Sequence, residues 1–290
     1  MPSDNPIAYA GEPGAFAEDA VLAAFGDVER VALGSFREVF EAVSDGRASA
    51  GVVPIENVIN GTVRENYDLM LEFELRIVGE VVVPVALCLA ALPGQRVDEI
   101  ERVYSHIQAL GQAETFLRGR PWQLLTTYNT AGAGKAIADR EERGAAAVLS
   151  PRAARLFGLE ILADEIGDLP ENRTRFVILA QAMPTGDASP TADEGLLSED
   201  PRQPKRTTLV LAVRNEPGTL LAVLRVFAEH GLNMSKLESR PSRERAWEYV
   251  FWVDLDTDAA DRATQAALDA LVQVTTMLRV LGSYPKASGA

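Results

Sequence analysis

Residues 181–206 constrain the architecture of this chain more than any other stretch. They read QAMPTGDASPTADEGLLSEDPRQPKR, which is rich in Pro, Gly, Ser and acidic residues and has no sustained apolar period. Such a composition is typical of a linker between folded parts. In a chain of 290 residues this linker separates residues 1–180 from residues 207–285, and both lengths suit folded domains.

The first segment alternates short apolar runs with helical patterns. A helix is expected over residues 16–25, and Ser35 is expected to cap a second helix in which Phe36, Val39, Phe40 and Val43 recur at helical spacing. This order predicts an α/β fold with mainly parallel sheets. The apolar stretch 81–92 falls midway, where we expect the chain to cross between two α/β lobes that flank a cleft. Strands are expected at residues 7–9, 31–33, 50–53, 103–104, 124–128 and 145–149.

The second segment has a different rhythm. Helices are expected over 218–230 and 259–272, because Leu220, Leu224 and Phe227 mark an apolar face on the first of them. The element order is therefore βαββαβ, that of a ferredoxin-like module. Strands are expected at residues 207–213, 232–237, 247–255 and 277–284.

Composition excludes several classes of protein. The net charge of −14 argues against a nucleic-acid partner, which requires a basic surface. Cys88 is the only cysteine, so neither a disulfide framework nor a cysteine metal cluster is expected, and its leucine neighbours predict an inert core thiol. The N-terminus lacks the pattern of a signal peptide, and the apolar run 78–92 is too short to span a bilayer. We therefore expect a cytoplasmic protein with no membrane partner.

Polar clusters follow the predicted strands, where ligands bind in open α/β sheets. The densest is the run from Asn172 to Phe176, which adjoins an apolar strand. Its density of hydrogen-bond donors suits a small anion with several charges, although an exposed turn is the alternative. The other clusters occupy residues 11–16, 54–63, 105–112 and 129–135.

Each of these clusters admits a structural and a functional interpretation. Glu56 and Asn57 either orient a ligand or belong to a turn closed by Asn60 and Gly61. Gln108 and Gln112 share one helix face, which either is solvated or binds an anion. No His/Asp/Glu grouping has metal-ligand spacing, and no G-x-S-x-G elbow is present. We therefore expect a site without metal or cofactor. The candidate helix caps are Ser105 and either Asn129 or Thr130.

Taken in order, these motifs resemble the prephenate dehydratase family, and the C-terminal segment resembles an ACT domain. The resemblance covers nearly the whole chain apart from the linker. Val58 stands where the family often has Ser, and Thr219 stands where Ala is common in ACT domains. The motifs are Gly11-x-x-Gly14-Ala15-Phe16, Pro54-Ile55-Glu56-Asn57 with Gly61, Ser105-His106-x-Gln108-Ala109-Leu110-x-Gln112 and Asn172-x-Thr174-Arg175-Phe176, followed by Gly218-Thr219-Leu220 and Glu238-Ser239-Arg240-Pro241.

The resemblance implies a two-lobed catalytic domain like that of type II periplasmic binding proteins, and a reaction that converts prephenate to phenylpyruvate, CO2 and water. Thr174 would donate a hydrogen bond to the departing hydroxyl, and His106 would supply the proton. Arg175 would pair with a substrate carboxylate through its planar fork. The residues expected to bind and orient the substrate are Ala15, Glu56, Asn57, Ser105, Gln108, Gln112, Thr130, Ala131, Asn172 and Phe176.

The ACT resemblance implies that L-phenylalanine, the end product, acts as allosteric effector at an interface between two modules. A homodimer or homotetramer follows from it, and the effector would shift a conformational population. A module that only dimerises is the alternative. The expected effector contacts are Gly218, Thr219, Leu220 and Asn233, together with a turn formed by Glu238, Ser239, Arg240 and Pro241.

Two rival functions remain open. A two-lobed fold with a sensory module also suits a regulator that binds a ligand without catalysis. Within the enzyme class, arogenate dehydratase differs only in a side-chain amine in place of a ketone.

Overall fold

The computed structural model describes residues 5–182, 202–241 and 249–287. Residues 183–201 of the predicted linker lie outside it, as do residues 242–248, which include the first two residues of the strand expected at 247–255. The chain divides into two compact units. The larger contains residues 4–73 and 81–177, and the smaller contains residues 1–3, 74–80 and 178–290. Strands β5 (Leu75–Pro84) and β11 (Arg173–Gln181) each continue from one unit into the other.

The first lobe of the larger unit is built on a sheet of order β2-β1-β3-β11-β5, with β4 beside β3. Strand β1 pairs in parallel with β2 and β3. Ser35 caps α2 as predicted, because its hydroxyl accepts the N–H of Glu38 at 3.3 Å. The elements are β1 (Ile7–Ala10), α1 (Phe16–Phe25), β2 (Arg30–Leu33), α2 (Phe36–Ser44), β3 (Ala50–Asn57), β4 (Gly61–Thr62) and α3 (Arg64–Glu72).

The second lobe has a five-stranded sheet of order β10-β6-β9-β7-β8. The prediction of mainly parallel sheets is correct here for β7, which pairs in parallel with β8 and β9, and wrong for β6, which pairs antiparallel with β9 and β10. Strand β6 enters directly from the crossing segment, without the helix that would return the chain for parallel pairing. The elements are β6 (Cys88–Ala91), a 3₁₀ turn (Val97–Glu99), β7 (Arg102–Ser105), α4 (Ile107–Gln112), α5 (Glu114–Leu117), β8 (Gln123–Thr126), α6 (Thr130–Arg140), β9 (Ala145–Leu149), α7 (Pro151–Leu156) and β10 (Glu160–Ala163).

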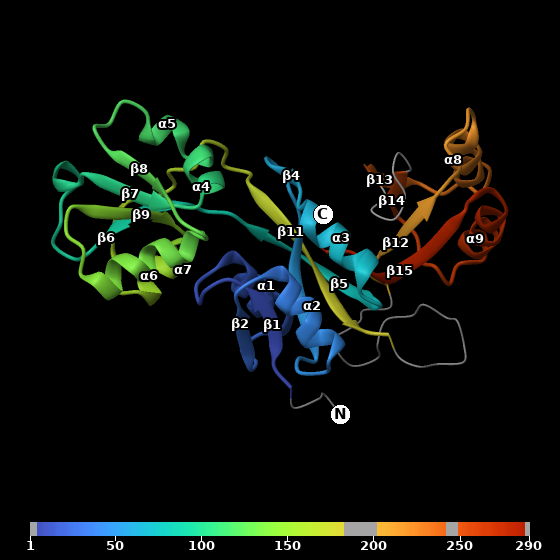
Figure 1. Cartoon of the computed structure of the whole chain (residues 1–290), viewed down its shortest axis with the longest axis horizontal. Coiled ribbons are helices and arrows are strands. Elements are labelled where there is room, and N and C mark those ends of the chain that lie inside the picture. The colour runs from blue at the N-terminus through green and yellow to red at the C-terminus, as the bar shows by residue number, and fades with distance from the viewer. Residues whose placement is uncertain (1–4, 183–201, 242–248, 288–290) are drawn as a thin grey trace. The chain divides into compact units, whose positions relative to one another are not determined.

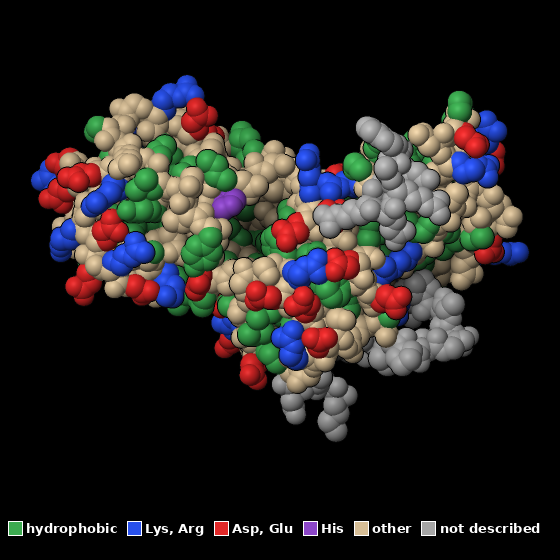
Figure 2. Space-filling view, viewed as in Figure 1, with side chains coloured by type: hydrophobic (Ala, Val, Ile, Leu, Met, Phe, Trp, Pro, Cys, Tyr) green, Lys and Arg blue, Asp and Glu red, His purple; other side chains and the backbone are tan. Residues whose placement is uncertain are grey.

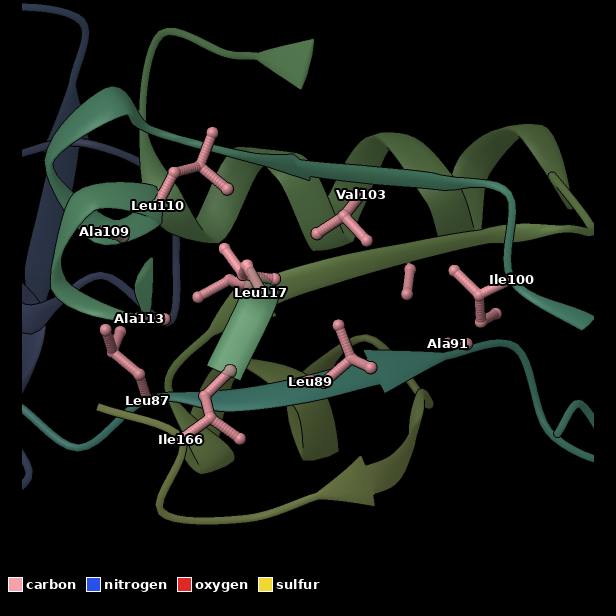
Figure 3. Close-up of a cluster of buried hydrophobic side chains, with 12 residues drawn as sticks. Leu87, Leu89, Ala91, Ile100, Val103, Ala109, Leu110, Ala113, Leu117 and Ile166 are labelled. Carbon is pink, nitrogen blue, oxygen red and sulfur yellow. The ribbon is translucent and has the colours of Figure 1, made fainter. Parts of the chain in front are cut away.

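Helices cover both faces of this second sheet, with α4 and α5 on one side and α6 and α7 on the other (Figure 1). Leu87 and Leu89 pack with Leu110 and Leu117 on the first side, as Figure 3 shows. The neighbouring Cys88 faces the second side, where it packs with α6 and α7. Burial raises the pKa of its thiol to about 12, which agrees with the predicted inert core cysteine.

A cluster of charged side chains joins the two lobes beside α1. The carboxylate of Glu18 is almost fully buried and contacts Arg30 at 2.7 Å and Arg152 at 2.9 Å. It also accepts the N–H of Gly14 at 2.6 Å. Gly14 has φ +88°, and a Cβ on it would lie 3.0 Å from the Cα of Ala153. A glycine is therefore required where the loop before α1 meets α7.

The C-terminal module has the predicted βαββαβ order and a sheet of order β13-β14-β12-β15. Apolar side chains of α8 and α9, including Phe227 and Leu271, fill its core. The α/β fold class and the ferredoxin-like module are thus confirmed. The elements are β12 (Lys205–Ala212), α8 (Thr219–Glu229), β13 (Met234–Pro241), β14 (Tyr249–Leu255), α9 (Arg262–Val274) and β15 (Met277–Pro285).

The first half of β5 belongs to the same unit as this module. Glu80 is buried, and its two oxygens lie 2.9 and 2.7 Å from Nη1 of Arg206. Gly282 approaches the strand so closely that a Cβ on it would lie 2.0 Å from the carbonyl oxygen of Ile77. These contacts tie β12 and β15 to a strand that comes from the middle of the sequence. No helix among the described residues is long and apolar enough to cross a membrane.

The Glu18 cluster predicts a pH-dependent contribution to stability. Burial alone would raise the pKa of Glu18, but hydrogen bonds from Arg152, the Gly14 N–H and Arg30 outweigh it and lower the pKa from 4.5 to about 2. Because the folded pKa is depressed, this stabilisation is present above about pH 4.5 and is lost as the pH falls toward 2. We expect Glu18→Gln to lower the free energy of unfolding by about 1–3 kcal/mol at pH 7. Urea denaturation at several pH values measures it.

The exposed Glu114, which pairs with Arg118 at 2.5 Å on the surface, provides the control. Glu114→Gln should change stability by less than about 0.5 kcal/mol at the same pH. If the loss caused by Glu18→Gln were equal at pH 7 and pH 3, the cluster would not act through the charge of this carboxylate.

Candidate functional site

A cavity of about 700 Å³ lies in the larger unit and is lined by residues of both lobes. Figure 2 shows the molecular surface hollowed in the left half of the view, beside a histidine. The wall combines side chains from strand ends with the first turns of several helices. Gly11, Ser35 and Asn57 come from the first lobe, and His106 and Asn129 come from the second. Residues of both lobes thus line one cavity.

Strand β11 crosses this wall, and its side chains alternate between two faces. Thr174 and Phe176 are buried and line the cavity. Arg175 lies between them in the strand and so points to the opposite face of the sheet. There Nη2 of Arg175 lies 3.4 Å from Oε2 of Glu56. Arg175 and Glu56, both predicted to contact the substrate, thus do not line the cavity.

The side-chain amide of Asn57 determines the direction of the hydrogen bonds at the site. Its oxygen accepts the backbone N–H groups of Ile59 at 3.0 Å and Asn60 at 2.9 Å. Two backbone donors can only face an oxygen, so the amide nitrogen must point the other way. Three oxygens lie within hydrogen-bond distance of that nitrogen: Oδ1 of Asn172 at 2.8 Å, Oγ1 of Thr174 at 3.0 Å and the carbonyl of Arg173 at 3.0 Å. Asn57 therefore holds the end of β3 against the start of β11.

This arrangement leaves the Thr174 hydroxyl as a donor. Its oxygen accepts from Asn57, and the described residues provide no hydrogen-bond acceptor for its proton. Because Thr174 lines the cavity, that proton is available to a bound ligand. Asn172 is buried and does not line the cavity. Its side-chain oxygen accepts from the Asn57 amide and so helps to orient it.

Helix α4 brings one edge of the second lobe to the cavity. His106, Gln108 and Gln112, which were predicted to contact the substrate, all line it. The residue that caps the helix is His106, because its Nδ1 accepts the N–H of Gln108 at 3.3 Å. Ser105, predicted as the cap, is fully buried one residue earlier and donates its hydroxyl to the carbonyl of Val148 at 2.6 Å.

The cap geometry and burial both favour the neutral imidazole of His106. Burial lowers its pKa from the ordinary 6.5, because a charged ring loses hydration. An imidazolium would also turn Nδ1 into a donor that faces the Gln108 N–H, and would place a positive charge at a helix N-terminus. The ring proton therefore resides on Nε2, which can donate a hydrogen bond.

Other helices also begin at the wall. Asn129, one of the two predicted caps, accepts the N–H of Gly132 at 2.5 Å, and Thr130 and Ala131 follow it along the cavity. Ala15 precedes α1 without a side-chain cap. First-turn N–H groups and the positive end of the helix dipole favour negative charge at such positions. The wall is thus suited to an anion although the chain as a whole is acidic.

Sequence reasoning missed several lining residues. Val85 and Leu87, from the crossing segment, add apolar surface. Tyr128 lies at the rim, where its hydroxyl donates to Oε1 of Glu12 at 2.7 Å. Arg64 and Glu65 begin α3, and the hairpin of β3 with β4 brings them to the cavity. The turn at Asn60-Gly61 was the available signal, since a tight turn returns the following residues to the strand they leave.

The predicted effector residues occupy two ends of the module's sheet. Gly218 has φ +88° and precedes α8, whose Thr219 donates its hydroxyl to the carbonyl of Arg214 at 2.7 Å. The residues 238–241 are the end of strand β13, paired with β14, and not the predicted turn. Val250 of β14 pairs with Arg240 on one side and with Ala212 on the other. Because Ala212 ends β12, the end of β13 lies near the loop that leads to Gly218. Leu220 lies in the first turn of α8.

Asn233 lies at the other end of the sheet. It precedes Met234, which pairs with Leu255, and its side chain donates to Oδ2 of Asp256 at 2.8 Å. Six residues of strand separate that end from Arg240, which corresponds to about 20 Å. Among the described residues, no group of three or more His, Cys, Asp or Glu side chains is placed to hold a metal ion.

Comparison with known proteins agrees with this geometry. A family model described as prephenate dehydratase matches residues 7–184, and one described as ACT domain matches residues 207–273. A bifunctional chorismate mutase/prephenate dehydratase of Aquifex aeolicus (strain VF5) is 38% identical over 284 residues, which are 97% of this chain and 74% of the relative.

Two solved structures resemble this chain over nearly its whole length. Prephenate dehydratase of Arthrobacter aurescens in complex with L-Phe is 30% identical with a TM-score of 0.83, covering 97% of this chain and 90% of that one. A structure described as GqqA, a novel type of quorum quenching acylase, is 30% identical with a TM-score of 0.85, covering 98% and 99%. Since its family model spans most of the chain and an ACT domain follows, the protein belongs to the prephenate dehydratase family.

Proposed function

We propose that this enzyme converts prephenate to phenylpyruvate, CO2 and water, and that L-phenylalanine regulates it through the ACT domain. The carrying observation is the Thr174 hydroxyl, which the Asn57 amide orients so that its proton faces an anion-binding cavity. As the ring carboxylate leaves as CO2, the electron pair of the broken C–C bond enters the ring and the C–O bond at the hydroxyl breaks. Negative charge therefore develops on the departing oxygen, where Thr174 donates.

Little further chemistry is required, because aromatisation drives the reaction. A donor placed where charge develops stabilises the transition state more than the ground state. Solvent supplies the proton that completes the water molecule, while neutral His106 donates a hydrogen bond through Nε2. Gln108 and Gln112 orient the substrate by their amides, and the helix N-termini at Ala15 and Thr130 balance its charge.

Thr174 is not placed to serve as the nucleophile of the acylase activity that is named for one structural relative. Among the described residues, the Thr174 hydroxyl contacts an amide, and no imidazole or carboxylate accepts its proton. A hydroxyl nucleophile needs such an adjacent base. The alternative function is that the protein binds a ligand without converting it. Adding prephenate and following the absorbance of phenylpyruvate distinguishes the two functions. Comparing kcat/KM for prephenate and arogenate decides between those two substrates.

Removing the Thr174 hydroxyl tests the core of the proposal. We expect Thr174→Val to lower kcat by roughly 10²–10³-fold with little change in KM, because the lost hydrogen bond forms fully only in the transition state. Thr174→Ser keeps a hydroxyl within reach of Asn57 and serves as the matched control, with kcat within about tenfold of the wild type. Equal activity in the Val and Ser variants would remove Thr174 from the mechanism.

The neutral state of His106 predicts the pH profile. With a pKa lowered below 6.5 by burial, the ring remains uncharged at neutral pH, so kcat/KM should be constant from about pH 7 to 9. His106→Asn preserves a helix cap and should keep kcat within about tenfold. If the wild-type rate instead fell as the pH rose through about 6–8 and this fall vanished in His106→Asn, imidazolium would be the proton donor.

The position of Asn233 predicts an effector site shared between two copies of the chain. The Gly218 loop and the end of β13 lie at one end of the sheet, so Asn233 reaches an effector there only from a second subunit. Asn233→Ala and Gly218→Val, which strains a residue at φ +88°, should each weaken L-phenylalanine binding. Calorimetry on mixed dimers of the two variants is decisive. A shared site regenerates one intact site per mixed dimer, whereas a site within one chain regenerates none.

A further inference from the structure

Arg64 occupies a position that the reaction scheme above does not use. Strand β4 pairs with β3 so that Gly61 faces Asn57 and Thr62 faces Glu56, and the N–H of Val63 bonds to the carbonyl of Ile55. The next residue, Arg64, begins α3. It is exposed to solvent and lines the cavity. The hairpin thus fixes the backbone of Arg64 beside the strand end whose Asn57 holds Thr174.

The charges of the cavity wall single out this residue. Among the described residues that line the cavity, Arg64 is the sole arginine or lysine and Glu65 the sole carboxylate. His106 is neutral, and Arg175 faces Glu56 on the opposite side of the sheet. A substrate with two carboxylates therefore meets one guanidinium on this wall, in addition to the fixed dipoles of helix N-termini and amides. Guanidinium groups match the planar carboxylate and bind it with two parallel hydrogen bonds.

The two carboxylates of prephenate differ in what the reaction does to them. The ring carboxylate loses its charge as it leaves, so a guanidinium paired with it would stabilise the ground state more than the transition state and slow the reaction. The side-chain carboxylate keeps its charge throughout, and a cation there binds both states equally. The apolar wall of Val85, Leu87 and Phe176 suits the group that becomes neutral CO2.

We propose that Arg64 binds the carboxylate that the substrate retains, the one on its side chain. This inference rests on the proposed function, because it concerns the same cavity and substrate. It assigns to Arg64 the role predicted from sequence for Arg175. Arogenate carries the same retained carboxylate, so Arg64 anchors either substrate and does not discriminate between them.

The product provides a direct test, because phenylpyruvate contains the retained carboxylate and lacks the leaving one. We expect Arg64→Gln to raise the KM for prephenate and the dissociation constant of phenylpyruvate by a similar factor, roughly 10- to 100-fold, the range for a lost charge-assisted hydrogen bond. The value of kcat should stay within about threefold, because the interaction is uniform along the reaction. Arg64→Lys keeps the charge but lacks the planar fork, so both of its constants should lie between those of the wild type and those of Arg64→Gln.

Arg140→Gln is the matched control, since Arg140 is exposed at the end of α6 and does not line the cavity. It should leave both constants unchanged. A raised KM with unchanged phenylpyruvate binding would overturn the proposal, because Arg64 would then contact the leaving carboxylate. Unchanged KM and unchanged product binding would also overturn it. Calorimetry measures phenylpyruvate binding without turnover, so a wild type that binds the product but does not convert prephenate would contradict the proposed function alone.

Discussion

The wall of the cavity depends on the orientation of one side-chain amide, that of Asn57. The Asn57 oxygen is held by the N–H groups of Ile59 and Asn60, so its nitrogen must donate toward Asn172 and Thr174. These donors and acceptors come from segments more than a hundred residues apart in the sequence, and they meet in a buried position where an unpaired polar group would be costly. The same contacts that hold β3 against β11 therefore decide which way the Thr174 hydroxyl can donate.

The sequence predicted most of the elements that build the site, because the periodic patterns and helix caps there are local. Residues 16–25 form the expected helix, and Ser35 and Asn129 cap their helices. The polar residues at the end of β3 and at the start of β11 also meet, because the N–H of Val58 bonds to the carbonyl of Arg173 and the Asn57 amide donates to Thr174. The pairing of β6 was not predictable in this way, because an apolar run of its length has no periodicity that reveals its direction.

The errors at individual residues have a common physical cause. The family resemblance assigned both Thr174 and Arg175 to the substrate, but neighbours in a strand point to opposite faces, and of the two only Thr174 lines the cavity. Ser105 was a candidate cap, but α4 begins at Ile107, so the capping position falls on His106, whose Nδ1 accepts the N–H of Gln108. Arg64 went unnoticed because its place at the cavity arises from a hairpin of only two paired residues. Side-chain direction and short pairings are set by tertiary contacts, which composition and spacing do not contain.

The close approach of Gly282 to Ile77 and the Glu80–Arg206 ion pair limit how an ACT domain can be exchanged between proteins. The ACT domain begins near residue 205 in the sequence, but the compact unit that contains it also includes residues 74–80 of β5. If the chain were truncated at the linker, Glu80 would lose its contact with Arg206, and the backbone of Ile77 that Gly282 covers would become exposed. A foreign ACT module would have to bring a glycine and a cation at matching positions. The module is thus not an interchangeable cassette, and evolution would have to exchange it together with the middle of β5.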